Sequence, residues 1–219
     1  VMVGNGMAGV RTLEELLKVA PDLYDITVFG AEPHPNYNRI LLSPVLAGEQ
    51  TLDEIILNPL AWYDEHGIRL HLGRKVTRID RVKRLVHAED GTAAAYDRLL
   101  LATGSSPFIL PVPGKDLDGV IAYRDIADTQ TMIEAATRYR QAVVIGGGLL
   151  GLEAANALRQ LGLLLAGALG ALVVIGANSE RDNAIRRLAS MIKPTSTVSS
   201  VAQSSRRSES SPARASRRS

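Results

Sequence analysis

The chain has 219 residues, of which 46% are hydrophobic, and a formal net charge of +2. That length and apolar content suffice to bury the core of one or two domains. Cysteine is absent, which excludes disulfides, thiolate metal sites, cysteine-ligated iron–sulfur clusters and redox-active cysteine pairs on this chain. The four histidines show no metal-ligand spacing, so we expect no metal site.

The charge is unevenly distributed along the chain. Residues 181–219 carry nine Lys and Arg against two acids, whereas residues 1–180 carry sixteen against twenty-one. From Thr195 onward Ser and Arg dominate, and too few apolar side chains remain to offset the entropy of ordering. We therefore expect a diverged, largely disordered tail at 179–219. The tail contains no aromatic residue on which a base can stack, so we expect no specific nucleic-acid partner.

A phosphate-binding glycine pattern opens the chain, Gly4-Asn5-Gly6-Met7-Ala8-Gly9. Apolar residues then recur at helical spacing up to Pro21, and DITVFG at 25–30 indicates a buried strand. Strand, glycine turn, helix and strand form the βαβ unit that binds a dinucleotide. We expect the first glycine to allow a tight turn, the second to admit a pyrophosphate and the third to let helix and strand pack. Glu32 follows the second strand, where it either accepts hydrogen bonds from a ribose or is an ordinary solvated carboxylate.

A second pattern of the same kind begins near residue 146. A short β-branched run at 142–145 leads into GGGLLG at 146–151, and Glu153 and a helix through Leu161 follow. Two dinucleotide fingerprints about 140 residues apart suggest two nucleotides in one reaction. A flavin that accepts hydride from a nicotinamide cofactor is the natural pair.

Four segments carry a resemblance to a known family. They are VGNGMAGVRTLEELL, DITVFGAEPHPNYNRILLSPVLAGE, VVIGGGLLGLEAANAL and YDRLLLATGSSP at 96–107, which we read as a buried apolar strand ending in Ala102-Thr103-Gly104. Together they resemble the two-dinucleotide flavoproteins of the pyridine nucleotide-disulfide oxidoreductase type. The match is narrower with the N-terminal FAD- and NAD(P)-binding reductase part of assimilatory NAD(P)H-dependent nitrite reductase large subunits. It extends from residue 1 to about residue 162.

This resemblance implies an α/β, Rossmann-like two-dinucleotide-binding flavoprotein fold. The FAD-binding domain would begin at 1–115, and a partial NAD(P)H-binding domain would be inserted at 116–178. No catalytic side chain is expected, because hydride transfer to a flavin needs alignment of two rings more than an acid–base pair.

The resemblance also implies the cofactor contacts, first those of FAD. The pyrophosphate would be held by the turn of Gly4, Gly6, Met7, Ala8 and Gly9, and the ribose by Glu32. Arg39 would lie over the phosphates and the backbone of Val76 against the adenine, while Ala102, Thr103, Gly104 and Arg124 would line the FAD. Surface salt bridges are the alternative interpretation of Arg39 and Arg124.

For NAD(P)H, the pyrophosphate would lie against Gly146, Gly148, Leu149, Leu150 and Gly151, with Glu153 at the nicotinamide end. Related reductases often have Lys after the Leu-Ser of the first loop. Pro44 follows Ser43 here, so one possible flavin contact is missing.

The resemblance ends after about residue 162. Residues 161–177 carry no charge and are at the short limit for a membrane span, but a displaced strand at 172–175 is the alternative we prefer. No export signal is visible at Val1, and we expect a cytoplasmic protein without a membrane contact. The chain has no Gly-Asp dipeptide, which members of the family usually supply to the flavin from a returning segment. We therefore expect an incomplete FAD site in a chain that is a fragment at both ends, with an ending that reads like an out-of-frame sequence.

The sequence thus predicts an FAD-dependent NAD(P)H oxidoreductase that passes electrons to a downstream centre or protein. Nitrite cannot be reduced on this chain, because siroheme and iron–sulfur ligation need cysteine. Disulfide reductases are excluded on the same ground. A reductase of ferredoxin or rubredoxin type and an inactive nucleotide-binding fragment are the alternatives.

Overall fold

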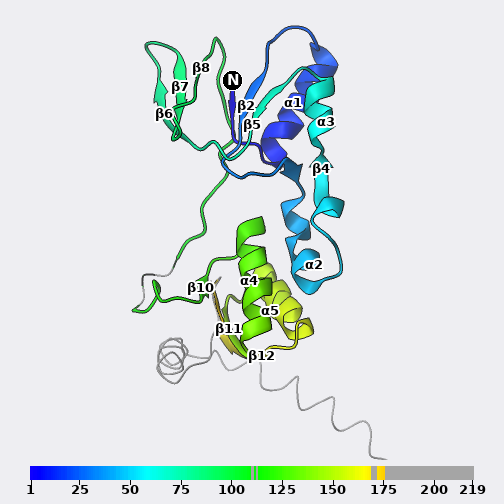
Figure 1. Cartoon of the computed structure of the whole chain (residues 1–219), viewed down its shortest axis with the longest axis vertical. Helices are drawn as coiled ribbons and strands as arrows, with labels where there is room; N and C mark the ends of the chain where they lie inside the picture. The colour runs from blue at the N-terminus through cyan, green and yellow to red at the C-terminus, as the bar shows by residue number, and fades with distance from the viewer. Residues whose placement is uncertain (110, 112, 169–171, 176–219) are drawn as a thin grey trace, which may run out of the picture.

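The computed structural model describes residues 1–109, 111, 113–168 and 172–175. The expected tail at 179–219 lies outside these residues. The described chain forms two α/β halves, drawn one above the other in Figure 1. The N-terminal half comprises residues 1–101, and the C-terminal half comprises residues 120–168 and 172–175.

The N-terminal half is built on a parallel sheet with the strand order β5-β2-β1-β9. Its strands are β1 (Met2–Val3), β2 (Thr27–Phe29), β5 (Arg69–His71) and β9 (Leu100–Leu101). Helix α1 (Met7–Val19) connects β1 to β2, and α3 (Leu60–Glu65) precedes β5. Val10 and Leu13 of α1 are buried against Met2 and Val28 of the sheet. The expected βαβ unit is therefore present, since a crossover helix covers two parallel strands.

Two smaller sheets complete the N-terminal half. An antiparallel meander consists of β6 (Val76–Asp80), β7 (Leu85–Ala88) and β8 (Ala93–Ala95). A β-ladder joins β3 (Asn36–Tyr37) to β4 (Ile56–Asn58). The segment between these strands contains short helices, which are η1 (Arg39–Leu41), α2 (Leu42–Ala47) and η2 (Asp53–Ile55).

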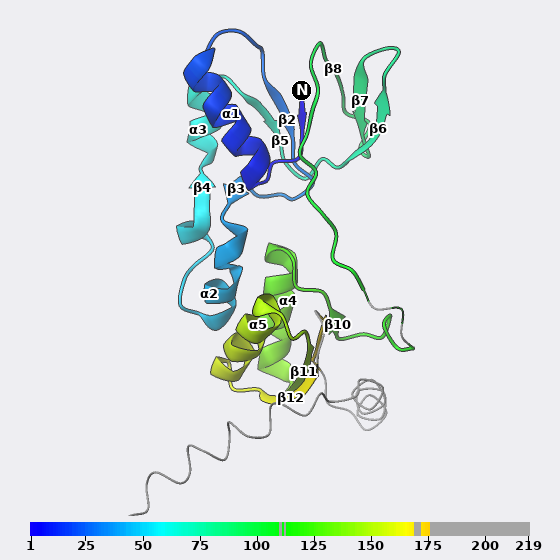
Figure 2. The ribbon, with the colours of Figure 1, turned by 180° about the vertical axis from the view of Figure 1, so that it is seen from behind.

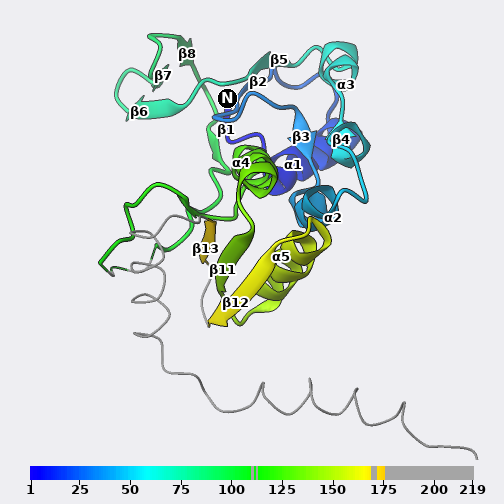
Figure 3. The ribbon, with the colours of Figure 1, turned by 60° about the horizontal axis from the view of Figure 1, so that its bottom comes forward.

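The C-terminal half contains a second βαβ unit. Its sheet has the order β10-β13-β11-β12, from β10 (Val120–Ile121), β11 (Gln141–Ile145), β12 (Leu164–Ala168) and β13 (Leu172–Ile175). Helix α5 (Leu149–Gln160) joins the parallel strands β11 and β12, and α4 (Ile126–Arg138) lies beside α5 (Figure 3). Strand β13 pairs antiparallel with both β10 and β11. The strand expected at 172–175 is confirmed.

Helix α2 connects the two halves, because it extends from the N-terminal half and packs on α4 and α5 (Figures 1 and 2). The apolar cluster at this contact contains buried side chains from both halves. They include Leu42, Val45, Leu46, Ile126, Met132, Ala154, Ala157 and Leu158. Part of the core of the C-terminal half is thus supplied by a helix that precedes it by about 80 residues in the sequence.

The strand expected to be buried before Ala102 is short and partly exposed, which corrects the sequence-based expectation. Strand β9 comprises only Leu100–Leu101, and Leu101 is 57% exposed. The reason is its position at an end of the described strand order, where it pairs with β1 alone. In the part of the chain that the structure describes, no helix is long and apolar enough to cross a membrane.

Truncation at the contact between the halves should be costly. Leu46 is fully buried in the shared cluster, so Leu46→Ala should lower the free energy of unfolding by about 2–5 kcal/mol through lost burial and a residual cavity. Urea denaturation measures this loss. The control is Val82→Ala at a 95% exposed position, which should change it by less than about 0.5 kcal/mol. Equal effects of the two variants would contradict the packing of α2.

Candidate functional site

The first glycine turn is closed tightly against the Ala102-Thr103-Gly104 segment. Gly4 has a φ of +106°, and a Cβ added there would lie 2.1 Å from the Ala102 carbonyl oxygen. A Cβ on Gly9 would lie 2.9 Å from the Gly4 oxygen, whereas a Cβ on Gly6 meets no described atom within 4 Å. The first and third glycines therefore permit close backbone packing, while the second faces open space.

The second glycine turn repeats this arrangement. A Cβ on Gly151 would lie 2.0 Å from the Gly146 oxygen, and a Cβ on Gly148 meets no described atom within 4 Å. Leu149 and Leu150, at the start of α5, are exposed. Each half thus has a strand, a closed turn and an open glycine directly before its connecting helix.

The helices that follow these turns differ from α4 in how they begin. At Gly6 before α1 and Gly148 before α5, no described side chain caps the helix, and neither first turn contains an acid. Helix α4 begins instead with a capping box in which Asp125 and Asp128 bond each other's backbone N–H groups. Uncapped N–H groups and the positive end of the helix dipole are suited to an anion such as a pyrophosphate.

Glu32 and Arg39 are brought together beside the first turn. The Glu32 carboxylate accepts hydrogen bonds from Arg39 Nη2 at 2.5 Å and from the Tyr37 hydroxyl at 2.6 Å. The Arg39 guanidinium lies 5.1 Å from the centre of the Tyr37 ring, and its Nη1 donates to the carbonyl of Arg124 at 2.7 Å. Burial and the Glu32 carboxylate raise the pKa of Tyr37. In this conformation each carboxylate oxygen of Glu32 accepts one hydrogen bond, which leaves each of them a further acceptor site.

The remaining residues expected around FAD lie at two places. Val76 packs with Val3 and Phe29, so the meander meets the sheet where the first glycine turn begins. Arg124 Nη2 lies beside Gly104, 3.7 Å from where a Cβ on that glycine would be.

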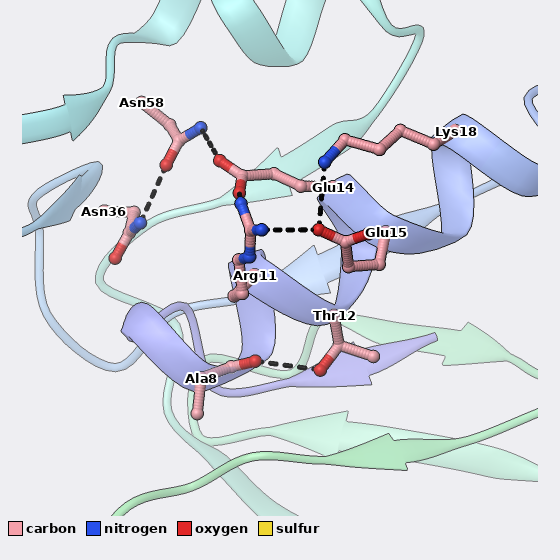
Figure 4. Close-up of polar contacts among 8 residues, drawn as sticks. All are labelled: Ala8, Arg11, Thr12, Glu14, Glu15, Lys18, Asn36 and Asn58. Atoms are coloured by element: carbon pink, nitrogen blue, oxygen red, sulfur yellow. Dashed lines mark hydrogen bonds and ion pairs between the residues drawn. The ribbon is translucent and has the colours of Figure 1, made fainter.

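A series of side-chain hydrogen bonds attaches the segment that contains Arg39 to helix α1 (Figure 4). The Asn36 amide donates to Asn58 at 2.7 Å, and the Asn58 amide donates to Glu14 on α1 at 3.0 Å. Arg11 donates in turn to the other Glu14 oxygen at 2.9 Å. The two asparagines are absent from the residues expected from the sequence, although buried side-chain amides are nearly always hydrogen-bonded.

Glu153 lies at the contact between α5 and α2. Its Oε2 accepts a hydrogen bond from the Ser43 hydroxyl at 2.7 Å, and the Tyr123 hydroxyl donates to Ser43 Oγ at 3.2 Å. Burial raises the pKa of Tyr123 to about 12. Ser43 and Tyr123 are absent from the residues expected from the sequence. The available signal was the single hydroxyl within the apolar run ILLSPVL.

Two consecutive dinucleotide-binding units, joined through α2, define the fold of the two-dinucleotide-binding flavoprotein reductases. The pyridine nucleotide-disulphide oxidoreductase family matches residues 1–192. The chain belongs to this family of oxidoreductases.

Curated relatives give a narrower match. The chain is 56% identical over 163 residues to the nitrite reductase [NAD(P)H] of Bacillus subtilis (strain 168), covering 74% of this chain and 20% of that protein. It is 52% identical over 163 residues to the assimilatory nitrate reductase electron transfer subunit of the same organism, covering 74% and 21%. The chain thus spans about a fifth of the length of these relatives.

Among solved structures, NADH:rubredoxin oxidoreductase from Clostridium acetobutylicum superimposes with a TM-score of 0.69 at 27% identity. The superposition covers 77% of this chain and 43% of that one. The two-dinucleotide fold and the oxidoreductase class expected from the sequence are confirmed.

A Cβ at the third glycine of the second turn should destabilise the fold. Alanine is favoured over glycine within a helix by about 1 kcal/mol, but the overlap with Gly146 should outweigh this gain, so Gly151→Ala should cost about 1–3 kcal/mol. Thermal or urea unfolding measures the loss. Gly148→Ala, where space is open, should cost less than about 1 kcal/mol. Equal losses would show that the close approach does not limit this position.

Alkaline pH should weaken the contact between the halves. The folded-state pKa of Tyr123 is about 12 against an ordinary value of 10.0. Its contribution to stability is therefore complete below pH 10 and is lost as the pH rises towards 12. Unfolding free energies measured across this range should decline, and less steeply in Tyr123→Phe. Because the pKa of Tyr37 is also raised, the unfolding free energy of Tyr123→Phe should still decline somewhat with pH. A decline as steep as that of the wild type would show that Tyr123 is not its cause.

Proposed function

We propose that this chain is the reductase part of an FAD-dependent NAD(P)H oxidoreductase of the nitrite reductase type. It binds FAD at the first glycine turn and NAD(P)H at the second, and it delivers the electrons to a centre or protein beyond this chain. The observation that carries the proposal is the repetition of one arrangement in both halves, an open glycine at an uncapped helix N-terminus after a parallel strand.

The residues present are compatible with FAD in the N-terminal half. The open space at Gly6 and the free N–H groups at the start of α1 suit the pyrophosphate, with Gly4, Met7, Ala8 and Gly9 forming the rest of the turn. Glu32 accepts the ribose hydroxyls at its remaining acceptor sites, and the neighbouring Arg39 lies over the phosphates. Bound FAD supplies the hydride acceptor. The lining is completed by Val76, Ala102, Thr103, Gly104 and Arg124.

NAD(P)H binds in the C-terminal half by the same physical means. Gly146, Gly148 and Gly151 shape the turn, and the N–H groups of Leu149 and Leu150 point to the pyrophosphate from the first turn of α5. Glu153 is about one turn further along α5, on the side that contacts α2. Its carboxylate is therefore directed to the N-terminal half, where the flavin is proposed to bind.

The names of the relatives support nitrite assimilation as the setting. Because this chain has no cysteine, it cannot ligate the centre at which nitrite is reduced. The acceptor is thus a downstream centre or a separate protein. Because the chain is similar to a rubredoxin reductase, a small iron–sulfur protein is the second candidate acceptor. An assay for reduction of added rubredoxin or ferredoxin distinguishes this acceptor from a downstream centre.

A pair of glycine variants tests the assignment of the two nucleotides. Gly6→Ala should keep the fold but weaken FAD binding by about tenfold or more, since the new Cβ occupies the open space at the first turn. Gly148→Ala should retain FAD and lose its bleaching by NADH and NADPH. The measurement is the visible spectrum of FAD-loaded protein before and after anaerobic nicotinamide addition. Wild-type protein that is colourless after incubation with excess FAD and removal of the free flavin would contradict the proposal.

A further inference from the structure

Two buried hydroxyls form a relay that ends on Glu153. Ser43 lies on α2 and is 8% exposed, and Tyr123 lies between β10 and α4 and is 6% exposed. The relay runs from Tyr123 to Ser43 at 3.2 Å and from Ser43 to Glu153 Oε2 at 2.7 Å. Three segments from both halves thus meet at one carboxylate.

The direction of the relay follows from the number of protons. Ser43 has a single hydroxyl proton, which it donates to the Glu153 carboxylate, so its oxygen is left to accept from Tyr123. Glu153 is therefore the final acceptor of the relay. Oε2 is therefore fixed, while Oε1 receives no hydrogen bond from the residues that the structure describes.

The surroundings strengthen this restraint. Tyr123 belongs to the buried apolar cluster that contains Leu42 and Ile126, whereas Glu153 is partly buried, and a hydrogen bond to a charged carboxylate is stronger than one between neutral groups. Within the described ranges no Lys or Arg forms a salt bridge with Glu153. The neighbouring Pro44 has no side-chain donor and no backbone N–H. Among the described residues, the Ser43 hydroxyl therefore restrains the carboxylate, and the Tyr123 hydroxyl restrains Ser43.

We propose that Ser43 and Tyr123 are positioning residues, which orient Glu153 so that its free oxygen accepts a hydrogen bond from the carboxamide of the bound reduced nicotinamide. This inference rests on the proposed function. It assigns a role to α2 beyond packing, because the helix that joins the halves also sets the direction of the carboxylate at the nicotinamide end.

Comparison of two ligands separates positioning from a structural role. NADH contains the nicotinamide, and ADP-ribose shares the rest of its dinucleotide framework without that ring. Ser43→Ala in the full chain should weaken NADH binding by about tenfold, the size expected for one charge-assisted hydrogen bond, and ADP-ribose binding by less than about twofold. Isothermal titration calorimetry measures both dissociation constants.

Three further variants test the relay: one keeps the hydroxyl at position 43, one removes the outer hydroxyl of the relay, and one removes a hydroxyl outside it. Ser43→Thr retains the donor and should restore NADH binding. Tyr123→Phe removes only the outer hydroxyl and should weaken NADH binding by a smaller factor, about threefold, while it keeps the packed ring. Thr129→Val removes a fully buried hydroxyl of α4 that bonds the Asp125 carbonyl. It is matched in burial but lies outside the relay, and it should change the NADH and ADP-ribose constants equally.

The outcomes distinguish failure of this inference from failure of the proposed function. Wild-type protein that binds neither NADH nor ADP-ribose overturns the proposed function and the inference with it. Wild-type protein that binds both, with equal weakening of both in Ser43→Ala, overturns the inference alone. If Ser43→Ala does not fold, Tyr123→Phe decides, and an unchanged ratio of its two dissociation constants refutes the positioning role.

Discussion

The burial of α2 against α4 and α5 is the constraint on which the arrangement of the whole chain depends. The connection from Ala102 to Val120 contains no helix or strand among its described residues, so it cannot by itself hold the halves in register. Leu42, Val45 and Leu46 do so by completing an apolar cluster that the C-terminal half cannot close alone. Because the burial of apolar area is favourable and non-directional, the polar contacts at Ser43 and Arg39 supply the orientation.

The glycine turns of the two halves share one backbone geometry, in which some glycines permit close packing and others leave open space. At Gly4 and Gly151 the backbone approaches another segment so closely that no side chain fits. At Gly6 and Gly148 the same turns leave space in front of a helix N-terminus. Helix α4 provides the contrast, because Asp125 and Asp128 cap its N-terminus and no anion is proposed to bind there. The difference in capping thus separates helix ends that are available to a ligand from one that is satisfied internally.

The sequence predicts well those features that depend on residues close together in the chain. The glycine turns, the βαβ units and the strand at Leu172–Ile175 all follow from local spacing and hydrophobic runs. The exposure of Leu101 was missed because burial of a strand depends on its neighbours in the sheet. The partner of Glu153 was missed for a related reason. Ser43 and Glu153 are 110 residues apart, and no local pattern indicates that α2 brings them together.

The position of Arg39 makes the two halves thermodynamically coupled. One guanidinium binds the Glu32 carboxylate in the N-terminal half and the Arg124 carbonyl just before α4. A ligand that displaced the Arg39 side chain from both partners would also remove a contact with the second half, and the free energy of that rearrangement would enter its affinity. Linkage requires the reverse as well, so a change in the relative orientation of the halves alters the affinity at the first glycine turn. Arg39 thus provides a direct physical link between the region around Glu32 and the contact of the two halves.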